Sequence, residues 1–94
     1  MAGKIWKLYI LECRDGTLYT GITDNLQRRL QAHNQGKGAK YTRGRYPVIL
    51  RYSENCESHS QALRREIEIK ALSRKEKLSL CGTFRPVTED IQSF

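Results

Sequence analysis

The fold is decided by residues 5–22, which read IWKLYILECRDGTLYTGI. Aliphatic, aromatic and β-branched residues dominate residues 5–12 and again residues 17–22, a composition typical of β-strands. Asp15-Gly16 between the two runs marks a tight turn. The stretch therefore predicts an antiparallel β-hairpin close to the N-terminus.

The length of the hairpin loop decides which side chains share a face. A two-residue Asp-Gly turn would place Tyr9 and Tyr19 on opposite faces of the sheet. A three-residue loop over residues 14–16, built as a type I turn with a left-handed glycine, pairs Tyr9 with Gly21 instead. Only this second register puts the two phenols on one face, and a site that uses both of them requires it.

A helix is expected to follow the hairpin. Asp24, with Gln27 three residues later, resembles a capping box, and a leucine stripe follows until Gly36 ends the segment. This helix carries Arg29 and His33, which are four residues apart and therefore lie on one face beside the leucines. The pattern brings a guanidinium and an imidazole close to the predicted core.

The remaining elements are read from periodicity and capping residues. We expect a short helical turn near residues 39–42, a third strand over residues 47–52 and a long helix over residues 60–72 capped by Ser58 with Gln61. Residues 74–80 form a second helical segment after a break near Ser73. Together these elements predict a chain of mixed strands and helices in β-β-α-α-β-α order.

The 94 residues are expected to form one domain over residues 1–82, with residues 83–94 as a loosely ordered C-terminal tail. The three scattered cysteines, Cys13, Cys56 and Cys81, show no metal-binding spacing and are expected to be reduced, which indicates the cytoplasm. No signal peptide or apolar run long enough to span a membrane is present, so we expect neither secretion nor membrane insertion. We expect a monomer.

Cationic residues are concentrated in the middle of a chain whose net charge is +7. No acid occurs between Asp24 and Glu54, while that interval holds Arg28, Arg29, Lys37, Lys40, Arg43, Arg45 and Arg51, with Tyr41, Tyr46 and Tyr52 among them. Cations contact phosphates and aromatic rings stack on bases, so this pattern indicates a nucleic-acid surface, with Lys37, Lys40, Tyr41, Arg43 and Arg45 as its loop candidates. A solvated basic face, or one attracted to an anionic membrane, is the alternative.

One acidic side chain stands out on the long helix. Glu66 falls between Ala62, Leu63 and Ile69 on the helical wheel, so its carboxylate points inward. Proteins often hold Mg²⁺ through a single carboxylate, and a structural ion pair with an arginine is the alternative. The residues alone favour the structural role.

Other side chains could serve phosphodiester chemistry. Arg29 could hold a non-bridging phosphate oxygen through charge-assisted bonds, or could be one more solvated cation; Arg28 points elsewhere on the wheel. Strand tyrosines usually pack, and a phenol with a pKa near 10 is a poor base. Tyr9 or Tyr19 would need a pKa shift from nearby cations, or hydrogen bonds to a metal-bound water, to act as one.

Taken together these residues resemble the GIY-YIG endonuclease superfamily, whose two signatures correspond here to residues 7–9 and to Tyr19-Thr20-Gly21. Arg29 and His33 then follow in family order, and Glu66 comes thirty-three residues after His33. The GKGAKYT loop at residues 36–42 and the segment at residues 62–66 also match. The resemblance covers about residues 5–80 and is nearest to small standalone bacterial members.

The resemblance implies an α+β fold, a small three-stranded antiparallel sheet flanked by helices. It also implies phosphodiester hydrolysis with one divalent ion, Mg²⁺ or Mn²⁺, held by Glu66. Tyr9 is then expected to be the general base, and Tyr19 to position the water or the phosphate. Arg29 would bind the phosphate, and His33 would assist proton transfer or bind phosphate. Gly21 would leave space where a side chain would block the substrate.

The chain departs from the family pattern at three places. Lys7 stands at the glycine of the first signature, and Thr20 stands at the isoleucine of the second. Many family nucleases carry an asparagine after the metal glutamate, and none follows Asn55 here. Lys70 and Lys77 are the candidates to replace it by charge.

Three functions are compatible with the sequence. The first is a metal-dependent DNA endonuclease, structure-selective or weakly specific, used in repair or recombination. The second is a domain that binds DNA or RNA without cutting it, and the third is an adaptor whose basic face docks on an acidic protein. DNA is favoured over RNA, and a protein partner could supply the specificity.

Overall fold

The computed structural model describes residues 5–38 and 42–83. Its helices and strands run in the order β1 Trp6–Glu12, β2 Leu18–Thr23, α1 Leu26–Asn34, β3 Ile49–Cys56, α2 His59–Lys70 and α3 Arg74–Thr83. The three strands form one antiparallel sheet in the spatial order β2-β1-β3, so β1 is central and β2 is an edge strand. The predicted α+β fold is confirmed.

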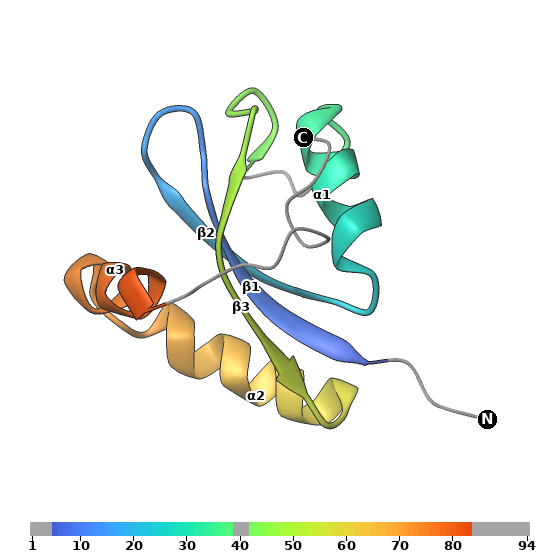
Figure 1. Cartoon of the computed structure of the whole chain (residues 1–94), viewed down its shortest axis with the longest axis vertical. Helices are drawn as coiled ribbons and strands as arrows, with labels where there is room; N and C mark the ends of the chain where they lie inside the picture. The colour runs from blue at the N-terminus through green and yellow to red at the C-terminus, as the bar shows by residue number, and fades with distance from the viewer. Residues whose placement is uncertain (1–4, 39–41, 84–94) are drawn as a thin grey trace.

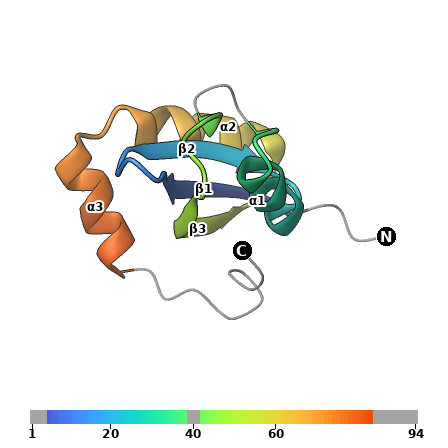
Figure 2. The same cartoon turned by 90° about the horizontal axis from the view of Figure 1, so that it is seen from above.

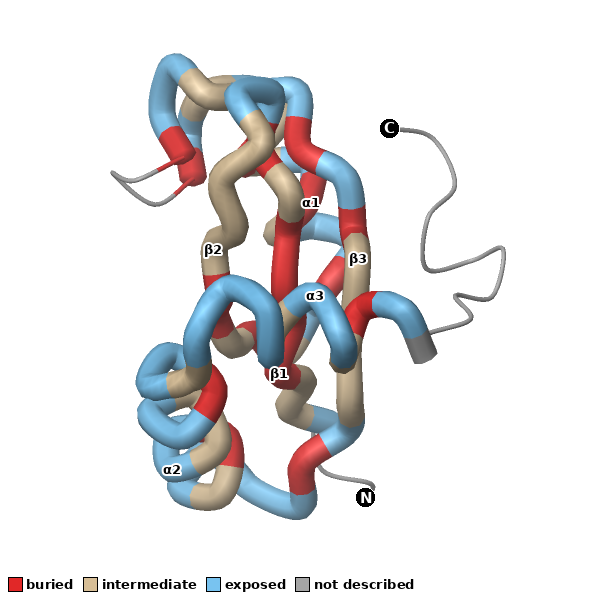
Figure 3. The backbone as a smooth tube through the Cα atoms, turned by 90° about the vertical axis from the view of Figure 1, so that its left-hand side faces the viewer, coloured by how far each residue is buried: buried red, intermediate tan, exposed pale blue. Residues whose placement is uncertain are grey.

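The helices cover both faces of the sheet, with α1 on one side and α2 and α3 on the other (Figures 1 and 2). Alternate residues of β1 therefore enter two separate cores. Tyr9 and Leu11 pack with the leucines of α1, whereas Leu8 and Ile10 pack against α2 and α3. Figure 3 shows β1 buried along most of its length while the outer surfaces of α2 and α3 are exposed.

The hairpin adopts the three-residue loop that the site requires. The Cys13 amide donates to the Thr17 carbonyl at 2.8 Å, and Gly16 has a φ of 86°, the left-handed conformation that favours glycine. Tyr9 consequently lies opposite Gly21 in the β1–β2 register. The two tyrosines share one face, as the sequence predicted.

One of the two predicted helix N-caps differs from the expectation, that of α1. α1 is capped by Asn25, whose side chain accepts from the Arg28 amide at 3.1 Å, and not by Asp24. The Thr23 hydroxyl accepts from the Asn25 amide and fixes the chain one residue later than the sequence pattern indicated. Ser58 caps α2 as predicted, through the Gln61 amide.

One expectation about the later elements needs correction. β3 begins at Ile49 and continues to Cys56, beyond the expected residues 47–52, because it pairs with the whole length of β1. The described elements run β-β-α-β-α-α, with the expected break at Ser73 between α2 and α3. Of the expected turn near residues 39–42, only Thr42 lies within the described residues, and the expected tail beyond residue 83 lies outside them.

Candidate active site

Four side chains from three elements meet beside the β1–β2 hairpin, and Glu66 of α2 lies near enough to influence Tyr9. β1 contributes Tyr9, β2 contributes Tyr19, α1 contributes Arg29 and His33, and α2 contributes Glu66. Their mutual influence is visible in the ionisation of Tyr9, whose pKa responds to Arg29, Tyr19 and Glu66. The structure therefore brings Tyr9, Tyr19, Arg29 and His33 together, and Glu66 acts on Tyr9 as the weakest of these influences.

The Tyr9 hydroxyl is the centre of the group. It lies 3.2 Å from Nε2 of His33, and it also interacts with the Arg29 guanidinium. The Tyr9 side chain is 1% exposed, and burial raises the pKa of its phenol to about 12. Of the two routes by which a tyrosine could act as a base, a pKa lowered by nearby cations is not the one that Tyr9 follows, because desolvation outweighs the attraction of Arg29 for the phenolate.

His33 is held from both sides of its ring. Its Nδ1 lies 2.7 Å from the Thr42 hydroxyl, while Nε2 faces Tyr9. The ring is 0% exposed, and burial followed by the charge of Arg29 lowers the pKa of His33 to about 4. The imidazole is therefore neutral at pH 7, with one nitrogen that donates and one that accepts. Full burial excludes direct contact with a phosphate and leaves proton transfer as the role open to His33.

Two glycines make room for these rings. A Cβ at Gly21 would lie 2.6 Å from the Tyr9 hydroxyl oxygen, so the space expected for substrate is filled by the phenol of Tyr9. A Cβ at Gly38 would lie 2.2 Å from Nδ1 of His33. Each glycine permits a close approach of backbone to ring that no other residue would allow.

Tyr19 completes an aromatic cluster with a different degree of exposure. Its ring centroid lies 6.3 Å from that of Tyr9 and 5.5 Å from that of His33. Tyr19 is half-buried, whereas the other two rings are fully buried. Of the three, Tyr19 is the ring placed to meet a ligand directly.

Glu66 approaches from α2 with most of its side chain covered. The carboxylate side chain is 19% exposed, and its Oε2 lies 3.4 Å from Nζ of Lys70. Within the described residues Glu66 pairs with this lysine and not with an arginine, and the neighbouring Arg65 pairs with Glu54 at 2.7 Å. Leu63, expected to flank Glu66 inward, is 41% exposed.

The oxygen chemistry of Glu66 fits a hard divalent cation. Within residues 5–38 and 42–83, no three side chains of His, Cys, Asp or Glu converge into a metal cage. A single carboxylate is nevertheless a common Mg²⁺ anchor, because that ion keeps several waters and takes further ligands from substrate phosphates. The donor set suits Mg²⁺ or Mn²⁺ better than Zn²⁺, which prefers nitrogen and sulfur.

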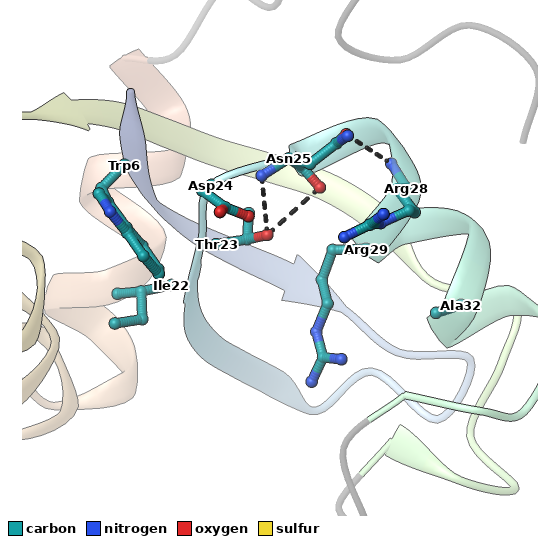
Figure 4. A pocket seen from close by; sticks show the side chains of 8 residues that line it. All are labelled: Trp6, Ile22, Thr23, Asp24, Asn25, Arg28, Arg29 and Ala32. Atoms are coloured by element: carbon teal, nitrogen blue, oxygen red, sulfur yellow. Dashed lines mark hydrogen bonds between the residues drawn. The ribbon is translucent and has the colours of Figure 1, made fainter. Parts of the chain in front are cut away.

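A pocket of about 290 Å³ opens beside α1 and the end of β2 (Figure 4). It is lined by Trp6, Ile22, Thr23, Asp24, Asn25, Arg28, Arg29 and Ala32. In Figure 4 the Arg29 guanidinium extends away from Arg28. Only Arg29 reaches the tyrosines, and its interaction with Tyr9 raises its own pKa further.

The basic loop candidates have different surroundings. Lys37 and Arg43 are exposed, but Arg45 forms an ion pair with Asp15 at 2.8 Å. Lys40 and Tyr41 lie outside the described residues. The structure thus offers Lys37 and Arg43 as surface cations near the site and gives Arg45 a part in anchoring the loop to the hairpin.

Sequence reasoning missed the support of His33. Thr42 is fully buried against Nδ1, and Gly38 lies against the same ring. Both belong to the GKGAKYT stretch, which the sequence showed only as part of a family resemblance. That stretch was the available signal, but nothing in its composition said which residue its threonine would meet.

The chain matches a known family over most of its length. Residues 5–79 fit the family model described as the GIY-YIG catalytic domain. A UPF0213 protein of Halobacterium salinarum is 58% identical over 73 residues, which are 78% of this chain and 95% of the relative. A UPF0213 protein of Staphylococcus haemolyticus is 53% identical over 73 residues, which are 78% of this chain and 89% of the relative.

A solved structure shows the same fold. The solution NMR structure of a UPF0213 protein from Bacillus halodurans superposes with a TM-score of 0.56 at 44% sequence identity, covering 92% of this chain and 92% of that chain. Within the part of this chain that the structure describes, no helix is both long enough and apolar enough to cross a membrane.

Proposed function

Because this chain belongs to the GIY-YIG family of nuclease-type domains, we propose that it is a metal-dependent endonuclease that hydrolyses phosphodiester bonds in DNA. It acts as a cytoplasmic monomer on structured or weakly specified sites in repair or recombination. The observation that carries the proposal is the Tyr9 hydroxyl, held between His33 and Arg29 with Glu66 close enough to influence it.

Tyr9 acts as the base through His33. The tautomer in which Nδ1–H of His33 donates to Thr42 leaves Nε2 free to accept the phenolic proton. Substrate binding has to uncover the Tyr9 hydroxyl, which is buried in the free protein. As Tyr9 then takes a proton from the attacking water, it passes its own to Nε2, so a free phenolate never has to form. This relay accommodates a phenol whose pKa is raised to about 12.

Arg29 and Tyr19 hold the phosphate. The Arg29 guanidinium lies against both phenols and keeps its charge at every working pH, so it can stabilise the negative oxygens of the pentavalent transition state. A phosphate bound there offsets the charge of Arg29, which is one of the two causes that depress the pKa of His33. Substrate binding therefore makes His33 a better proton acceptor.

Glu66 is the residue that would hold the divalent ion. When bound, Mg²⁺ or Mn²⁺ supplies charge neutralisation at the phosphate and a more acidic water. Lys70, which contacts Oε2 of Glu66, has to give up part of that contact. Such a displacement costs little, because the Lys70 side chain is half-exposed and its ammonium can return to water.

A second candidate is a domain that binds nucleic acid without cutting it. It is favoured by one observation, the absence of any asparagine after Glu66, where many family nucleases place one. The two candidates agree on nucleic-acid binding and differ on turnover.

The experiment is cleavage of labelled branched, flap, single-stranded and duplex DNA and of RNA, with Mg²⁺, with Mn²⁺ and with chelator. Wild type is compared with Glu66→Ala, whose fold is checked by circular dichroism. Metal-dependent cutting by wild type alone supports the nuclease and identifies its substrate shape. Binding without cutting supports the second candidate, and cutting by the folded Glu66→Ala variant contradicts the metal role.

A further inference from the structure

We propose that the nucleic-acid backbone runs along the outer edge of β2, and that Lys77 of α3, with Lys70 of α2, binds a phosphate adjacent to the scissile one. This inference rests on the proposed function, because a scissile phosphate exists only if the protein cuts DNA. The evidence for it is two further pockets beside β2 and the cations of α2 and α3 that line them.

A pocket of about 320 Å³ lies between β2 and the helices α2 and α3. It is lined by Leu18, Tyr19, Thr20, Lys70 and Lys77. Tyr19 belongs to the catalytic cluster, and Lys70 contacts the Glu66 carboxylate at 3.4 Å. The pocket is therefore continuous with the catalytic cluster on the side away from Arg28.

A second pocket, of about 180 Å³, extends the same edge. It is lined by Thr17 and Leu18 of the hairpin and by Arg74 and Lys77 of α3. Arg74 and Lys77 are three residues apart and so lie on one face of the helix. Neither side chain forms an ion pair within the described residues, and both cations are available to an anion.

The three pockets follow β2 from one end to the other. The pocket with Arg28 and Arg29 touches the C-terminal end of the strand, and the two lysine pockets touch its N-terminal half. A strand of six residues spans about 20 Å. Phosphates occur about every 3.4 Å of axis along one strand of duplex DNA, so this edge can face several in succession.

Thr20 adds a polar group to the pocket that Lys70 and Lys77 both line. Its side chain is 4% exposed, and its hydroxyl has no hydrogen-bond partner in the part of the chain that the structure describes. A buried hydroxyl left without a partner costs about 1–3 kcal/mol. Thr20 stands where the family signature has isoleucine, so this chain places an unused donor beneath the two lysines.

The test measures binding, so that it does not depend on cutting. In a Glu66→Ala background, the affinity for a fluorescein-labelled branched DNA is measured by fluorescence anisotropy over a series of salt concentrations. Loss of one phosphate contact lowers the slope of log K against log salt by about 0.7–0.9. We expect Lys77→Gln to show this loss with several-fold weaker binding, and Lys77→Arg to restore the slope.

Lys75→Gln is the matched control, because Lys75 is an exposed cation on the same helix and lines neither pocket. If Lys77→Gln and Lys75→Gln change the slope of log K against log salt equally, the proposal is overturned. If wild type cuts DNA and the two variants bind it equally well, the proposed phosphate path is contradicted and the proposed nuclease activity is not. Wild type that cuts nothing while Lys77→Gln lowers the slope contradicts the nuclease and supports the path.

Discussion

Acidification from pH 7 to pH 5 should destabilise this protein through His33. Its pKa is 6.5 when unfolded and about 4 when folded, so between these values the unfolded chain binds a proton that the folded chain does not. Stability is therefore full above pH 6.5 and is lost as pH falls towards 4. For one group with these pKa values, the free energy of unfolding falls by about 2 kcal/mol between pH 7 and pH 5.

The assay is urea unfolding at the two pH values. The carboxylates whose pKa is lowered in the folded chain, Asp15, Glu54 and Glu76, stay ionised there over this window and hardly contribute. His33→Gln should remove most of the pH dependence, whereas His59→Gln, at the chain's other histidine, should keep it. If wild type and His33→Gln lose the same stability on acidification, the buried, neutral imidazole is refuted.

Three further substitutions test the packing and the chemistry of the site. Tyr9→Phe should lower the single-turnover cleavage rate by about 100-fold or more with little change in DNA affinity, because it removes only the hydroxyl; equal losses in both would contradict its role as base. Gly21→Ala should lower the free energy of unfolding by about 1–3 kcal/mol and slow cleavage, because its Cβ would lie 2.6 Å from the Tyr9 hydroxyl, while Gly82→Ala, whose Cβ meets nothing within 4 Å, should do neither. Thr20→Val should raise the free energy of unfolding by about 1 kcal/mol, because the buried hydroxyl that it removes has no partner within the described residues; a loss of stability in chemical denaturation would argue against this.

The hairpin and its register could be predicted because local chemistry decides them. Asp15-Gly16 locates the turn, and the left-handed Gly16 allows the three-residue loop that pairs Tyr9 with Gly21. Arg29 and His33 follow from a four-residue spacing on a short helix. The hairpin register and the shared helix face depend on residues close together in the sequence, so they can be read from it directly.

The surroundings of the site could not be predicted, because they depend on where distant segments pack. The contact of Thr42 with His33 requires the path of a loop that has no periodicity. Leu63 is exposed, against expectation, because α2 packs on the sheet through Ala62 and Ile69. The raised pKa of Tyr9 likewise follows from its burial in the three-dimensional fold.

The most direct test of the central claim is the single-turnover rate of Mg²⁺-dependent DNA cleavage by Arg29→Ala and Arg28→Ala, measured with enzyme in excess so that binding is saturated. The two arginines are adjacent and line the same pocket, but only Arg29 reaches the tyrosines. We predict a loss of about 100-fold to 1,000-fold for Arg29→Ala and a change of only a few-fold for Arg28→Ala. Equal effects of the two substitutions would contradict it.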